Sequence, residues 1–128
     1  MAGNIVDAEE NRLLDASLGT AAFTAPTTPI KVALLTANGT DSAAGTEVTG
    51  GSYARQTVTF AAASAGATSN TALLRWSNMP ACTVTGIEIY DSAGTPRRIW
   101  HGALTSSKTL SAGDAFEIAA GALTISLD

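Results

Sequence analysis

The alternation of apolar and polar positions after residue 29 predicts a series of short β-strands. Apolar residues alternate with small or polar ones over residues 30–35, 56–60 and 123–127, as expected for strands that bury one face. Further strands are predicted over residues 73–76, 83–90, 97–104 and 115–118. Turn signals separate them at intervals of roughly 8–12 residues, a spacing typical of sandwiches and barrels. We therefore expect an all-β fold, a small β-sandwich or jelly-roll-like domain of about seven or eight strands.

The strand over residues 83–90 has apolar residues at positions of both parities. Ile87 and Ile89 fall on one face, and Val84 and Tyr90 fall on the other. This pattern favours a central strand that is buried on both sides. A turn at residues 91–96 makes residues 83–104 a predicted β-hairpin.

Two other segments carry turn or loop signals. Asn38-Gly39 indicates a tight turn after the first strand, and Gly113-Asp114 indicates another near the C-terminus. Residues 61–71 contain small and polar residues in quantity, and we expect a long loop there.

The first segment is the only good candidate for a helix. Asn4 is its expected N-cap, acidic residues occupy the first turns, and Gly19 is placed to end it in a left-handed conformation. Leu14 and Leu18 share a face at a spacing of four. Because residues 20–29 form an extended connector rich in Thr and Pro, we divide the chain into an N-terminal helical arm, residues 1–19, and one β-sandwich domain, residues 20–128.

Composition changes this picture by indicating a thin core. The chain has 128 residues and is 45% hydrophobic, but 25 of its residues are alanine and only 26 are Ile, Leu, Val or Phe. A domain with so few large side chains gains little from its own interior. We therefore expect stabilisation from neighbouring subunits, as a homo-oligomer for which a trimer is our first choice.

Charge and cysteine content argue against several classes of partner and cofactor. The formal net charge is −4, with five Arg and two Lys scattered along the chain, so we expect no nucleic acid and no membrane as partners. One cysteine and one histidine leave no pattern for a thiolate or paired-histidine metal site, and we expect no metal and no cofactor. The first residues lack the basic start of a signal peptide, which favours synthesis in a cytoplasm.

No combination of residues forms a convincing catalytic site. His101 with nearby carboxylates could belong to a serine triad, but the chain has no Gly-x-Ser-x-Gly elbow, and a structural histidine is favoured. Asp114 and Glu117 could form an acid pair, although turn chemistry explains Asp114 and a solvent-facing strand position explains Glu117. Cys82 is interpreted as a small buried apolar residue. We therefore expect that the protein is not an enzyme and has no catalytic residues.

The aromatic residues suggest contacts with other subunits. Trp76, Tyr90 and Trp100 fall on predicted strands, where they could supply core volume, form an interface or stack on a sugar. We favour core or interface, and interpret Arg97-Arg98 as solvated charges. The candidate interface comprises Leu14, Leu18, Trp76, Tyr90 and Trp100.

Several motifs give the chain a resemblance to a known group of proteins. They occupy residues 11–15, 46–55, 56–60, 86–91, 100–104, 111–118 and 120–125. With these motifs the chain resembles small virion proteins of tailed bacteriophages, described as minor capsid, decoration or tail-fibre proteins. The resemblance implies a structural protein located in the virion, and no catalytic residue comes with it.

Three functions remain in competition. The first choice is a capsid decoration protein, a cement or minor capsid protein that binds the major capsid protein and stabilises the head. The alternative is a tail-fibre, tail-tip or baseplate component that contacts other virion proteins. A small carbohydrate-binding module is the third, and it requires exposed Trp76 and Trp100.

Overall fold

The computed structural model describes residues 4–127 and contains ten strands and one helix. Residues 1–3 of the predicted arm and residue 128 of the predicted β domain lie outside the described residues. The elements are β1 (Asn4–Ile5), α1 (Asp7–Ser17), β2 (Ile30–Ala37), β3 (Thr46–Glu47), β4 (Gln56–Val58), β5 (Ala67–Ser69), β6 (Leu74–Trp76), β7 (Cys82–Tyr90), β8 (Arg98–Leu110), β9 (Phe116–Ile118) and β10 (Thr124–Ser126). The predicted all-β class with a short N-terminal helix is confirmed.

The larger layer is a six-stranded antiparallel sheet. Its strand order is β1-β8-β7-β2-β3, with β4 pairing with another part of β2. The predicted hairpin is confirmed and extends further than expected, since Cys82 pairs with Leu110 at its far end. β7 lies between β8 and β2, and both Ile87 and its neighbour Glu88 are buried. The prediction of a central strand buried on both sides is therefore confirmed.

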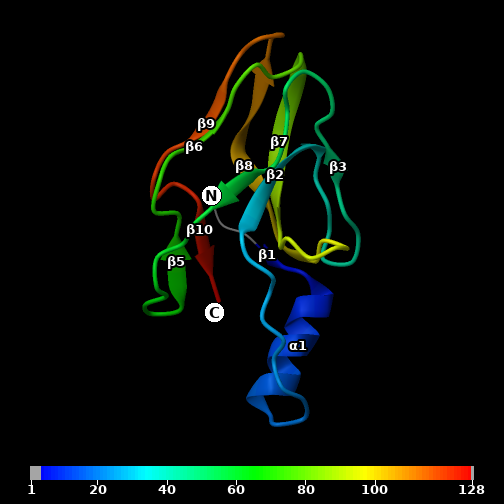
Figure 1. The fold of residues 1–128 in the computed structure, drawn as a ribbon, viewed down its shortest axis with the longest axis vertical. Coiled ribbons are helices and arrows are strands. Elements are labelled where there is room, and N and C mark those ends of the chain that lie inside the picture. The colour runs from blue at the N-terminus through cyan, green and yellow to red at the C-terminus, as the bar shows by residue number, and fades with distance from the viewer. Residues whose placement is uncertain (1–3, 128) are drawn as a thin grey trace.

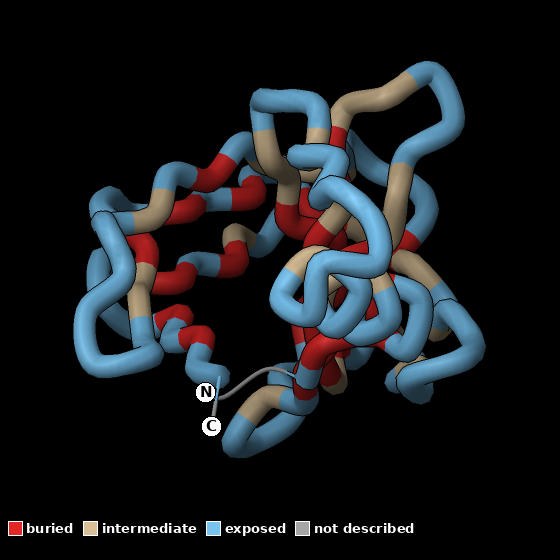
Figure 2. Tube along the Cα trace, turned by 90° about the horizontal axis from the view of Figure 1, so that it is seen from below, coloured by how far each residue is buried: buried red, intermediate tan, exposed pale blue. Residues whose placement is uncertain are grey.

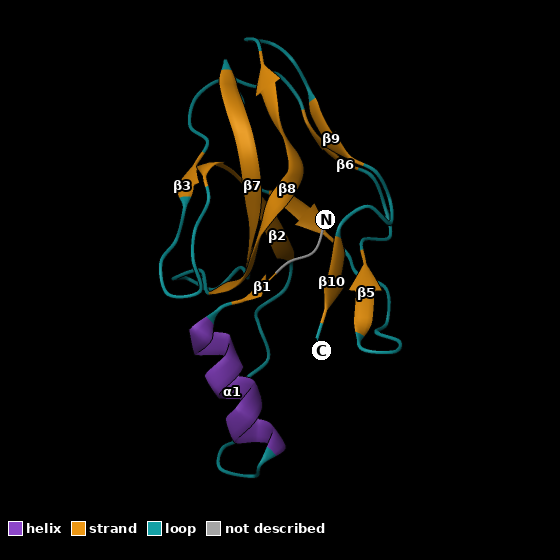
Figure 3. Ribbon diagram, turned by 180° about the vertical axis from the view of Figure 1, so that it is seen from behind, coloured by secondary structure: helices purple, strands orange, loops and turns teal. Residues whose placement is uncertain are grey.

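The second layer consists of two short ribbons, one formed by β5 and β10 and the other by β6 and β9. Both ribbons stand on the same side of the larger sheet (Figures 1 and 3). The buried stretches of the two layers face one another, while the loops around them are exposed (Figure 2). Their apolar residues form one core cluster: Val32, Leu34, Val48, Val58, Leu74, Trp76, Met79, Val84, Ile87, Ile89, Leu110, Phe116, Ile118, Leu123 and Ile125.

A bulge in the hairpin corrects one expectation about the faces of β7. Val84 pairs with Lys108 and Gly86 pairs with Ala103, so the register shifts between them. The bulge rotates the strand locally and brings Val84 into the same core cluster as Ile87 and Ile89. The assignment of Val84 and the two isoleucines to opposite faces was wrong, because strict alternation fails across a bulge.

The helix begins two residues later than predicted. Asn4 is not its N-cap; it lies in β1, where it pairs with His101 of β8, and Val6 is the N-cap instead. Pairing with the sheet edge keeps residues 4 and 5 extended. The predicted C-terminal end is correct, because Gly19 follows the helix with φ 76°, a left-handed conformation that glycine adopts without strain. α1 projects beyond the end of the sheet (Figure 1).

Two predicted loops differ from the structure. Asn38-Gly39 forms no tight turn, since residues 38–45 make a longer connection to β3. Gly39 instead allows a close backbone approach: a Cβ there would lie 2.6 Å from Glu88 Oε2 and 2.7 Å from the Gly45 nitrogen. The expected loop over residues 61–71 contains β5, which pairs with β10. Pairing with a distant strand overrides the loop-like composition.

Candidate functional site

The exposed apolar side chains of α1 mark one end of the molecule. Leu14 is 57% exposed and Leu18 is 77% exposed, so both leucines of the predicted interface are accessible. A groove of about 630 Å³ runs beside the helix, lined by Ile5, Glu10, Leu13, Leu14, Ser17 and Leu127. We call this the helix groove. It brings the first and last described parts of the chain together.

Leu127 belongs to the helix groove although the sequence pattern placed it elsewhere. Its position continues the alternation of Leu123 and Ile125, which predicted a buried residue. β10 ends at Ser126, however, and Leu127 is 52% exposed beside α1. Leu127 comes after the last paired residue of the strand. The sequence carries no signal for this, because it does not mark where the pairing ends.

The structure separates the three aromatic residues of the predicted interface. Trp100 is half-buried, pairs with Ile5 across β1 and β8, and lines a hollow of about 420 Å³ that also reaches Leu127. It therefore adjoins the helix groove. Tyr90 lies in another cluster, with the Arg55 guanidinium 3.9 Å from its ring centroid and its hydroxyl donating to Glu88 at 3.1 Å. Burial and the Glu88 carboxylate raise the pKa of Tyr90 to about 12.

Trp76 must be removed from the candidate interface. It is 1% exposed and packs edge-on against Phe116, with ring centroids 5.8 Å apart. Its indole nitrogen is buried and has no hydrogen-bond partner among the described residues. The side chain supplies volume to a core that is otherwise poor in large residues, so it cannot touch a partner or a sugar in the folded chain.

Arg97 and Arg98 are not solvated charges, contrary to the interpretation from sequence. Their side chains are 15% and 13% exposed, respectively. Arg97 forms a bidentate pair with Glu9 of α1, and Arg98 Nε donates to Glu88 of β7 at 2.5 Å. Both carboxylates are buried. Sequence reasoning missed the pair of Arg97 because Glu9 lies 88 positions away. It missed the pair of Arg98 because the sequence did not show which residues face each other across the predicted hairpin.

Arg97 also fastens the connector and the hairpin turn. Its Nη1 donates to the carbonyl oxygen of Thr24 at 2.9 Å. The Asp91 carboxylate accepts from the backbone nitrogens of Arg97, Thr27 and Ala93. Burial would raise the pKa of Asp91, but these donors outweigh burial and lower it. Helix, connector and hairpin are thereby tied together at one end of the sheet.

The residues of the motif at 46–55 form a second polar cluster. Arg55 donates from Nε and Nη2 to the two oxygens of Glu47, at 3.0 and 2.9 Å. The Tyr53 hydroxyl donates to Glu47 at 2.6 Å and accepts from the Leu34 nitrogen at 2.9 Å. Burial acts to raise the pKa of Glu47, but the hydrogen bonds from Arg55 and Tyr53 lower it on balance. This motif fixes the β3–β4 connection to the central sheet.

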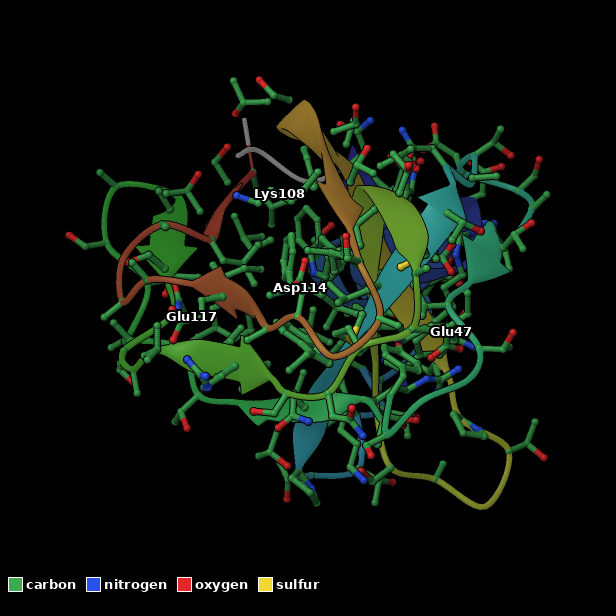
Figure 4. All side chains as sticks on the ribbon, turned by 90° about the horizontal axis from the view of Figure 1, so that it is seen from above. Glu47, Lys108, Asp114 and Glu117 are labelled. Atoms are coloured by element: carbon green, nitrogen blue, oxygen red, sulfur yellow. The ribbon has the colours of Figure 1, made fainter. Side chains whose placement is uncertain are left out.

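The residues that could have carried chemistry have structural surroundings. His101 is 8% exposed and its Nε2 lies 2.6 Å from Asp41 Oδ1. Asp114 accepts from the Ser111 nitrogen in its turn, as expected, and the exposed Glu117 pairs with Arg75 at 2.8 Å. The labelled Asp114 and Glu117 side chains lie apart in Figure 4. Cys82 is partly buried against the core, and burial raises the pKa of its thiol.

Residues 4–127 contain no group of three or more His, Cys, Asp or Glu side chains placed to hold a metal ion. Their one helix is neither long enough nor apolar enough to cross a membrane.

The chain is similar to a described family of proteins. The model of a protein family described as "Podophage GP4 fiber I protein gp80" matches residues 4–126. No curated protein matches the chain. The family match covers the helix, both layers and every residue that lines the helix groove except Leu127.

Proposed function

Because the chain belongs to the Gp80 family of podophage fibre proteins and is thus a structural protein of a phage virion, we propose that it is a fibre subunit. The observation that carries this proposal is the match of the fibre family over residues 4–126. Capsid decoration, the first choice from the sequence, receives no support from that match. The tail-fibre alternative fits it better.

The helix groove supports an assembly role and is the proposed contact with neighbouring virion proteins. Exposed apolar side chains are unfavourable in water and often mark interfaces. Three of the exposed large apolar residues, Leu14, Leu18 and Leu127, lie on α1 or beside it. Association into a homo-oligomer, with a trimer as first choice, remains part of the proposal. Contact with the major capsid protein belongs to the decoration alternative.

We propose a structural role rather than catalysis. In its support, the buried carboxylates of Glu9 and Glu88 are paired with Arg97 and Arg98, and His101 is held by Asp41. Groups engaged in this way stabilise the fold and are poorly placed to exchange protons with a substrate. The buried Trp76 likewise argues against the carbohydrate-binding alternative, which required both tryptophans to be exposed.

The test is the number and place of copies in purified virions of the phage that encodes this chain. Quantitative mass spectrometry against the major capsid protein gives the copy number, and immunogold electron microscopy gives the place. We expect about a dozen copies or a small multiple, located on a fibre, because fibres attach at few symmetric positions. Label spread over the head with hundreds of copies would instead support decoration. Absence from the particle would overturn both virion roles.

A further inference from the structure

A hollow separates the second half of β8 from β9. Its volume is about 420 Å³, and its walls include residues 104–106 and Lys108 of β8 and residues 116–119 at β9. Successive side chains of a strand point to opposite faces of the sheet. A hollow lined by consecutive residues on both sides therefore faces the edges of two strands. We call it the edge hollow.

Both strands present a free edge to the edge hollow. Among the described residues, β9 pairs with β6 alone, and β8 beyond His101 pairs with β7 alone. Backbone N–H and C=O groups along such edges have no ladder partner, and they form a template for another extended chain. The apolar contacts of a bound strand would come from the half-buried Leu104 and from the small accessible parts of Phe116 and Ile118, which are 7% and 6% exposed and line the same hollow.

Two features disfavour a second copy of this chain as the occupant. Val84 pairs with Lys108, and Gly86 pairs with Ala103. Residues 104–107 of β8 therefore oppose Thr85 alone, and β8 bulges at the edge hollow. A bulge and an edge lysine both hinder regular pairing at the edge of β8, including pairing with a second copy of β8. Lys108 is exposed and makes no ion pair within residues 4–127. It extends from β8 toward the second layer (Figure 4). The positive charge of Lys108 favours an acidic residue in the segment that binds in the edge hollow.

We propose that an extended segment of another virion protein binds in the edge hollow by adding as a strand to the free edge of β9. The bulge of β8 forms the opposite wall. The segment alternates apolar residues, which contact Phe116 and Ile118, with polar ones, and carries an acidic residue near Lys108. The proposal relies on the proposed fibre function only in naming the partner as a virion protein; the peptide-binding surface stands independently.

The test selects linear peptides of roughly ten residues, the length of a long strand, from a display library on the purified full chain. We expect enrichment of sequences with alternating apolar residues and one Asp or Glu. Hydrogen exchange of residues 116–118 should slow in the complex. N-methylation of alternate peptide residues should abolish binding, because it removes N–H donors while keeping the side chains.

Matched variants locate the site. Ala122→Trp fills the edge hollow and should weaken binding by about tenfold or more, whereas Ala120→Trp, outside its lining, should leave binding unchanged. Lys108→Glu should weaken binding of acidic peptides by about threefold, the size of an exposed ion pair, and Lys31→Glu is the control with equal charge. Circular dichroism checks the fold of each variant.

Several results would overturn the proposal. They are no enrichment, binding that tolerates N-methylation, protection at the helix groove in place of residues 116–118, or equal effects of the matched variants. Protection of residues 116–118 in a self-associated protein without peptide would assign the edge to a second copy. Because the selection uses purified protein, it can succeed or fail independently of the copy number and place in virions that test the fibre role.

Discussion

Arg97 joins the hairpin to helix α1 through a bidentate ion pair with Glu9, a residue 88 positions away in the sequence. Glu9 is 2% exposed, and Arg12 also donates to it at 2.8 Å. The pair determines where the helix sits against the sheet. Because α1 lines the helix groove, the pair of Arg97 and Glu9 both stabilises the fold and positions the proposed assembly surface.

Breaking this pair should destabilise the fold. Arg97→Met leaves the Glu9 carboxylate buried with Arg12 as its remaining cation, and we expect the free energy of unfolding to fall by about 3 kcal/mol. Urea denaturation at neutral pH measures the change. Arg75→Met, at the exposed pair with Glu117, is the matched control and should change stability by less than about 1 kcal/mol. Equal losses in the two variants would contradict the buried role of Arg97.

Burial of Trp76 predicts a simple optical result. In the Trp100→Phe variant the remaining emission comes from Trp76, which is 1% exposed. We expect blue-shifted fluorescence with acrylamide quenching several-fold weaker than in the same variant unfolded in urea. Trp76→Ala should also lower the free energy of unfolding by about 3–5 kcal/mol, the cost of removing a large core side chain. Strong quenching in the native state would place Trp76 on the surface and restore the sugar-binding alternative.

The lowered pKa of Glu47 gives stability a pH dependence. The folded-state pKa lies below the ordinary 4.5, so its contribution is full above pH 4.5 and is lost as pH falls through the folded-state value. Glu47→Gln should therefore lower the free energy of unfolding by about 1 kcal/mol at pH 7. The difference from wild type should shrink below pH 4.5. Denaturation of both proteins from pH 3 to 7 checks this, and a constant difference would contradict the mechanism.

The predictable parts of the fold were those determined by local pattern. Alternation identified β2, β4 and β10, and Gly19 identified the end of the helix. The errors arose where distant partners decide. Asn4 lies in β1 because it pairs with β8, and residues 67–69 form β5 because they pair with β10. A bulge in the hairpin places Val84 in the main core.

The candidate interface shows the same division. Leu14 and Leu18 were identified because a helical face carries its own spacing, and both are exposed. Trp76 was misplaced because a β-strand pattern does not say which face is covered by a second layer. The buried pair of Arg97 was missed because its partner, Glu9, lies 88 positions away. The buried pair of Arg98 was missed because the pattern does not show which residues face each other across a hairpin.

Anchoring of α1 at one end only predicts uneven dynamics. Glu9 fixes the first turn, whereas Leu14 and Leu18 are exposed. In the isolated protein we expect the helix to be partly frayed, with amide exchange fastest toward Leu18, and ordered in the assembled particle. Hydrogen exchange of residues 5–18 in both states measures this. Equal protection in the two states would contradict a contact through the helix.

Loss of the apolar side chains of the helix groove should impair assembly without unfolding the subunit. Leu14→Ser and Leu127→Ser replace side chains that are 57% and 52% exposed, so each should change the free energy of unfolding by less than about 1 kcal/mol. Burying the same side chains against a partner is worth on the order of 1–2 kcal/mol each, and loss of both should reduce incorporation into particles about tenfold or more. Complementation with the double variant, scored by mass spectrometry of purified particles, measures incorporation.

Leu73→Ser, which removes a leucine that is 53% exposed and outside the groove, is the matched control. Normal incorporation of the double variant would show that assembly uses another surface, and the edge hollow would then be the remaining candidate.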